Sequence, residues 1–103
     1  MPKYLFAYHG GSAPTTPEDG KRVMQIWETW FTRIGAGVID GGAPVGQSTT
    51  ITPAGVTANG GANPVSGYSI FEAADHAAAV KLAQSCPILA NGGNVEIAPV
   101  MQM

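Results

Sequence analysis

The chain has 103 residues, of which 45% are apolar and 12% are charged, and its net charge is −2. This length fits one domain, residues 1–103, with a single core. The sequence has no basic cluster, so we do not expect nucleic acid as a partner. The N-terminus has only about six apolar residues before His9, too few for a signal segment or a membrane span. Cys86 has no second cysteine with which to pair, so we expect a reducing, cytoplasmic location.

The first part of the chain predicts a strand followed by a long helix. Residues 3–9 alternate large aromatic side chains with smaller ones, which is typical of a strand, and a glycine pair follows them. Thr16 is a suitable N-cap, and Pro17 is a suitable first helical residue. We expect this helix to end near residues 35–37, where two glycines can adopt the left-handed conformation.

The middle of the chain predicts an interrupted second strand and a hairpin. Residues 38–40 begin a strand, and a segment rich in glycine and proline breaks it. We expect the strand to resume at residues 48–52. A turn at residues 59–61 would then close a hairpin onto the strand that begins at Gly67.

Residues 67–87 predict a strand, a capped turn and a helix. Asp75 is a suitable N-cap, and Pro87 is expected to end the helix. One apolar stripe on this helix is formed by Ala79, Leu82, Ala83 and Cys86. A last strand follows over residues 95–100.

The predicted order is β-α-β-β-α-β, which indicates an α+β protein of the ferredoxin-like type. Its antiparallel sheet would carry two helices on one face. The other face of the sheet also carries apolar side chains and needs cover. We therefore expect a homodimer through the sheet face, which would form a dimeric α+β barrel.

Four segments of the chain resemble the YCII-related proteins. They are MPKYLFAYHGG, WFTRIGAGVIDGGAP, VSGYSIFEAADHAAAVKLAQSCP and GGNVEIAPVMQM. The resemblance covers nearly the whole chain and implies a ferredoxin-like fold and a dimeric α+β barrel. None of the four segments is a catalytic motif.

The chain departs from two branches of that family. One branch carries an Asp-Gly-Pro-Phe turn before the third strand, and the corresponding residues 56–60 lack its proline, phenylalanine and acidic side chain. Another branch has a histidine on the first helix, paired with an aspartate in its active site. The first predicted helix here has no histidine, so that pair is not carried over.

His9 and Asp40 are the candidate catalytic residues. Each lies beside a glycine pair at the end of a predicted strand segment, a usual place for functional side chains. If the two strand ends meet, the carboxylate could orient the imidazole as a general acid–base pair. The alternative is a solvated loop histidine and a turn-forming aspartate.

Aromatic side chains form a candidate ligand pocket. Their rings and polar tips suit a small apolar or aromatic ligand. The candidate pocket residues are Tyr8, Trp27, Trp30, Phe31 and Tyr68. The same spacing also fits plain core packing against the sheet.

The remaining chemical candidates are weaker. Glu72 and Glu96 are buried acids if they point between sheets, or partners of basic groups if they do not. His76 fits an exposed helix start, and Cys86 lies on an apolar stripe where a thiolate is disfavoured. The glycine pairs and the separated histidines match no phosphate loop and no zinc spacing, so we expect no metal and no cofactor.

Two functions therefore stay open. One is a cofactor-independent acid–base enzyme that acts on a small apolar or aromatic metabolite through His9 and Asp40. The other is a non-catalytic ligand-binding or accessory dimeric protein that uses the same pocket. Contact between the two side chains at a concave pocket would favour the enzyme, and their separation would favour the binding protein.

Overall fold

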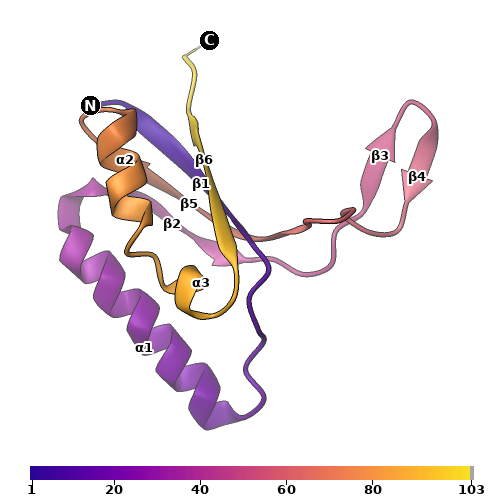
Figure 1. The fold of residues 1–103 in the computed structure, drawn as a ribbon, viewed down its shortest axis with the longest axis horizontal. Helices are drawn as coiled ribbons and strands as arrows, with labels where there is room; N and C mark the ends of the chain where they lie inside the picture. Colours follow the sequence, from indigo (N-terminus) through magenta and orange to yellow (C-terminus); the bar gives the residue numbers. More distant parts are fainter. Residues whose placement is uncertain (103) are drawn as a thin grey trace.

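The computed structural model describes residues 1–102 as a four-stranded antiparallel sheet, two longer helices and a separate two-stranded hairpin (Figure 1). The helices are α1 (Pro17–Ile34), α2 (His76–Ala83) and the short α3 (Pro87–Ala90), with a 3-10 turn η1 (Gly35–Gly37) after α1. The strands are β1 (Lys3–His9), β2 (Val38–Pro44), β3 (Thr50–Thr52), β4 (Gly55–Thr57), β5 (Val65–Glu72) and β6 (Asn94–Pro99). The main sheet has the order β2-β5-β1-β6. The predicted α+β class is confirmed.

Local capping signals fix the starts of both longer helices. The Thr16 side chain accepts a hydrogen bond from the Asp19 amide at 3.1 Å, and Pro17 is the first residue of α1. The Asp75 carboxylate accepts from the Ala78 amide at 2.8 Å, before α2. Both predicted N-caps are therefore confirmed, because each depends only on residues within one helical turn.

The prediction for the chain between β2 and β5 is wrong. Residues 48–52 do not resume β2. Instead β3 pairs with β4 in a sheet of their own, and this hairpin projects away from the main sheet (Figure 1). The Asn59 side chain accepts from the Gly61 amide at 3.0 Å in a local turn rather than closing a hairpin onto β5. Ile51 and Val56 on the projecting hairpin are 78% and 72% exposed.

Pro87 has a different role from the predicted one. Helix α2 ends at Ala83, before Pro87, and Pro87 is the first residue of α3. Proline fits this position because the first helical residue needs no amide hydrogen for the helix. The predicted apolar stripe holds, since Ala79, Ala83 and Cys86 are buried and Leu82 packs against the core.

The core lies between the main sheet and the helices. Alternation along β1 and β5 turns one set of side chains toward the helices, and the inward set on β1 is Tyr4, Phe6 and Tyr8, all buried. The Phe6 and Phe71 rings meet edge to face with centroids 4.6 Å apart. No helix among the described residues covers the opposite face of the sheet (Figure 1), and the molecule measures only 18 Å along its shortest axis. Within residues 1–102, no helix combines the length and apolar character needed to cross a membrane.

Candidate functional site

A cavity of about 510 Å³ lies between α1, the main sheet and the loop that follows β1. We refer to it below as the cavity. Its lining residues are Tyr8, Val23, Met24, Trp27, Glu28, Phe31, Ile88, Asn91 and residues 10–14, 41–44 and 66–69. The volume falls within the range of small-molecule sites, about 300–1,000 Å³.

The cavity exists because β5 presents small residues to one half of α1. The inward positions of β5 are Gly67, Ser69 and Phe71, all buried. At Phe71 the helix and the sheet are tightly packed, since the Trp30 ring lies 5.3 Å from the Phe71 ring, centroid to centroid. At Gly67 and Ser69 no large side chain fills the same layer. The space left between helix and sheet is the cavity.

Aromatic rings form much of the cavity wall, and four of the five predicted pocket residues line it. The rings of Tyr8 and Trp27 meet edge to face at 5.0 Å, and Phe31 lies beside Trp27 at 5.9 Å. Tyr68 also lines the cavity, but it pairs with Ala7 and therefore belongs to the opposite face of the sheet. Tyr8 and Tyr68 consequently do not stack on a shared ligand from one side.

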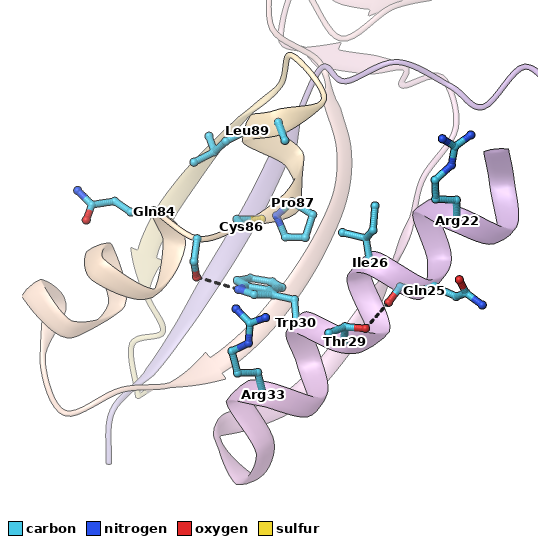
Figure 2. A pocket seen from close by; sticks show the side chains of 12 residues that line it. Arg22, Gln25, Ile26, Thr29, Trp30, Arg33, Gln84, Cys86, Pro87 and Leu89 are labelled. Atoms are coloured by element: carbon cyan, nitrogen blue, oxygen red, sulfur yellow. Dashed lines mark hydrogen bonds between the residues drawn. The ribbon is translucent and has the colours of Figure 1, made fainter.

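Trp30 does not line the cavity. It is buried, and its indole nitrogen donates to the Ser85 hydroxyl at 2.9 Å. It borders a second depression, here called the groove, of about 600 Å³ between α1 and the segment that joins α2 to α3. Figure 2 shows the Trp30 side chain reaching from α1 toward that segment, with Arg33 beside it. Trp30 therefore fits the alternative reading, a core residue.

The groove is the more polar of the two depressions. Its helix side carries Arg22, Gln25, Thr29 and Arg33 (Figure 2). Arg22 is already paired with the Asp19 carboxylate. The surface of the cavity, by contrast, is mostly apolar, and its polar side chains are Glu28, Asn91 and the serines Ser12, Ser66 and Ser69. The cavity is therefore the better candidate for a small apolar ligand.

A chain of hydrogen bonds crosses the wall of the cavity. The Tyr8 hydroxyl donates to the Ser69 hydroxyl at 2.9 Å, and Ser69 donates to the Gly41 carbonyl oxygen at 2.8 Å. Burial raises the pKa of the Tyr8 phenol well above its ordinary value, so the phenol keeps its proton. Burial also raises the pKa of the neighbouring Cys86 thiol to about 11, which disfavours a nucleophilic thiolate.

His9 is held in place by hydrogen bonds on both sides of its ring. The side chain is at the end of β1 and the residue is 8% exposed. Nδ1 lies 2.9 Å from the Asn63 carbonyl oxygen, and Nε2 lies 3.1 Å from Oε1 of Glu96. A carbonyl oxygen only accepts, so Nδ1 carries a hydrogen and donates it. His9 thus joins β1 to β6 and to the segment that returns from the projecting hairpin.

The predicted His9–Asp40 pair does not form. Asp40 is exposed, and its carboxylate accepts from the Gly42 amide at 2.8 Å within its own turn. In the sheet register His9 lies opposite Val65 and Asp40 lies opposite Ile70 of the same strand. At the rise of a β-strand, these positions are about 16 Å apart along β5. The prediction failed because it took Asp40 as the end of a strand segment. β2 instead continues to Pro44, whose partner Gly67 lies at the same end of β5 as Val65.

The other candidate residues, Glu72, Glu96 and His76, each lie against another residue of the fold. The side chain of Glu96 is 71% exposed and pairs with His9, whereas Glu72 is half-buried opposite Lys3. The His76 ring lies edge-on to the Tyr4 ring at 5.8 Å. In the part of the chain that the structure describes, no cluster of three or more His, Cys, Asp or Glu side chains could hold a metal ion.

Sequence reasoning missed the loop wall of the cavity. Residues 10–14 close one side of it, and Asn91 fastens this loop by donating from its side-chain amide to the Ser12 carbonyl oxygen at 2.9 Å. The sequence signal for this loop was the glycine pair Gly10 and Gly11. Both have positive φ in the structure, and they turn the chain back after β1.

We compared the chain with protein-family models, with curated proteins and with solved structures, and none of them matches it. Function is therefore inferred from the cavity and from the chemistry of its lining.

Proposed function

We propose that the chain is a non-catalytic binding protein that holds a small apolar or aromatic ligand in the cavity and acts as a homodimer. The observation that carries the proposal is the cavity of about 510 Å³ walled by the rings of Tyr8, Trp27 and Phe31. Such a wall offers a flat ligand a large contact area at little loss of conformational freedom. The single buried Cys86 supports a reducing, cytoplasmic setting.

The binding protein is favoured over the acid–base enzyme for two reasons. His9 and Asp40 each have hydrogen-bond partners elsewhere, and neither residue lines the cavity. The hydroxyl hydrogens of Tyr8 and Ser69, which do line it, are both used in internal hydrogen bonds. An acid–base reaction needs a group that can exchange a proton with the substrate. Among the described lining residues the one carboxylate is that of Glu28, an exposed residue of α1.

Binding can be tested with 2-naphthol as a probe, through the indole N–H signals of the two tryptophans in an NMR spectrum. We expect 2-naphthol to shift the signal of Trp27, which lines the cavity, and to leave that of Trp30 unchanged. Trp27→Ala should weaken binding about tenfold or more, because it removes one aromatic wall. The matched control is Ile26→Ala on the same helix, which borders the groove. Equal affinities of both variants and the parent would contradict the proposed site.

We further propose that the chain has a ferredoxin-like, YCII-like fold and pairs through the open face of its sheet. The strand order β2-β5-β1-β6, with α1 after β1 and α2 after β5, supports the fold assignment. The open face supports the pairing, since Leu5 lies opposite both Ile70 and Ala98 and forms an apolar patch with them. A second copy of the chain would remove that patch from water.

A charge on the open face should prevent the pairing. We expect Leu5→Glu to convert a dimer into a monomer in sedimentation equilibrium, because two carboxylates would face each other across the interface. Val80→Glu is the matched control, since Val80 on α2 is 38% exposed and Leu5 is 37% exposed. Ile70→Glu provides a second variant should Leu5→Glu misfold. A parent chain that sediments as a monomer at all concentrations would refute the pairing.

A further inference from the structure

The hydrogen-bond directions at Tyr8 and Ser69 in the cavity wall determine whether a ligand must donate or accept a hydrogen bond there. The Gly41 carbonyl oxygen only accepts, so the single hydroxyl hydrogen of Ser69 must be donated to it. The contact between Tyr8 and Ser69 then requires the Tyr8 hydroxyl to donate. Both hydrogens are used, and what remains on these two oxygens is lone pairs. Ser69 is 0% exposed, which leaves the Tyr8 oxygen as the acceptor for a ligand, with no hydroxyl hydrogen left to give.

The charge of the cavity lining also disfavours anionic ligands. Glu28 contributes a carboxylate, and none of the described residues that line the cavity is Lys, Arg or His. A bound anion would lose its hydration and gain no cationic partner, which is strongly unfavourable. A neutral donor has no charge to desolvate, and the lost hydration of a cation can be offset by the Glu28 carboxylate. Aromatic faces such as those of Trp27 and Tyr8 also attract cations.

We propose that the cavity selects neutral or cationic aromatic molecules that donate a hydrogen bond, such as phenols and arylamines, and rejects aromatic carboxylates. This inference rests on the ligand-binding function proposed above. The aromatic ring of the ligand contacts Trp27 and Phe31. Its hydroxyl or amino group donates to the hydroxyl oxygen of Tyr8.

Three probes with the same ring system test the selectivity: 2-naphthol, 2-methoxynaphthalene and 2-naphthoate. Each is titrated at neutral pH into the intact chain, with calorimetry for affinity and the Trp27 indole N–H signal for location. We expect 2-naphthol to bind about three- to tenfold more tightly than 2-methoxynaphthalene, the effect of one hydrogen bond. We expect 2-naphthoate to give no Trp27 shift at the concentrations that saturate with 2-naphthol.

Two variants separate the effect of the Tyr8 acceptor oxygen from the effect of the Glu28 charge. Tyr8→Phe keeps the ring and removes one acceptor oxygen, so it should reduce the preference for 2-naphthol over 2-methoxynaphthalene. Glu28→Lys places a cation at the lining and should allow 2-naphthoate to bind. Glu18→Lys makes the same change of charge on α1 at a residue outside the lining and should not.

The possible outcomes distinguish a failure of the proposed selectivity from a failure of the proposed ligand site. If 2-naphthoate binds as tightly as 2-naphthol and shifts the Trp27 signal, the selectivity is refuted and the ligand site stands. If none of the three probes shifts that signal, the ligand site itself is refuted, and the selectivity with it. Binding that shifts the Trp30 signal alone would move the site to the groove and refute both.

Discussion

Replacing Phe71 with alanine is expected to lower the free energy of unfolding by about 3–5 kcal/mol, the range for a buried phenylalanine. Phe71 is 0% exposed and lies on β5, which has β1 on one side and β2 on the other. Its ring contacts the Phe6 ring from β1 at 4.6 Å and the Trp30 ring from α1 at 5.3 Å. The truncation therefore leaves a hole where helix and sheet meet, and neighbours held by regular structure cannot collapse into it.

Urea unfolding followed by circular dichroism, at one fixed protein concentration, measures this effect. The matched control is Ile51→Ala on the projecting hairpin, where the side chain is 78% exposed. We expect that control to change the free energy by less than about 0.5 kcal/mol. A Phe71→Ala variant as stable as the control would mean that the core does not lie between β5 and α1.

The features that sequence predicted well are those that depend on neighbouring residues. Thr16 and Asp75 each cap a helix through an amide three residues away, and the alternation in β1 is visible in its own seven residues. The aromatic pocket was predicted in part for the same reason, since Trp27 and Phe31 lie one helical turn apart and share a face of α1.

The features that sequence did not predict depend on strand register. Whether His9 and Asp40 meet is decided by which residues of β5 each one faces, and bulges on β2 shift that pairing twice. The partner that His9 does have, Glu96, comes from β6, a distant part of the chain. Likewise, residues 48–52 have the composition of a strand in either sheet. Only the competition between β4 and β5 for pairing decides where they lie.

The second large loss of stability is expected from a substitution at Gly42, on the bulged part of β2. Gly42 has φ 71°, and a Cβ atom there would lie 1.7 Å from the Tyr68 carbonyl oxygen and 2.6 Å from its carbonyl carbon. Both are backbone atoms of the neighbouring strand, so no side-chain rotation relieves the clash. We expect Gly42→Ala to lower the free energy of unfolding by about 3 kcal/mol or more, from backbone strain and overpacking together.

Gly46→Ala is the control, because it makes the same substitution in the same region without either problem. No atom lies within 4 Å of a Cβ atom built at Gly46, and its φ lies outside the left-handed region. There alanine should leave stability unchanged or raise it by about 0.4–1 kcal/mol, through a less flexible unfolded chain. Gly42→Ala is thus expected to destabilise the fold strongly, whereas Gly46→Ala is not expected to destabilise it. Equal effects would place the bulge elsewhere on β2.

The same substitution also tests how the cavity depends on the sheet. Gly42 lines the cavity, and its amide holds the Asp40 carboxylate that shapes the bulge. A shift of β2 away from Tyr68 would move residues 41–44, and the Gly41 carbonyl that orders the Ser69 and Tyr8 hydroxyls would move with them. Any folded Gly42→Ala protein should therefore lose the preference for 2-naphthol over 2-methoxynaphthalene, whereas Gly46→Ala should keep it. A folded Gly42→Ala protein with full preference would show that the bulge and the cavity are independent.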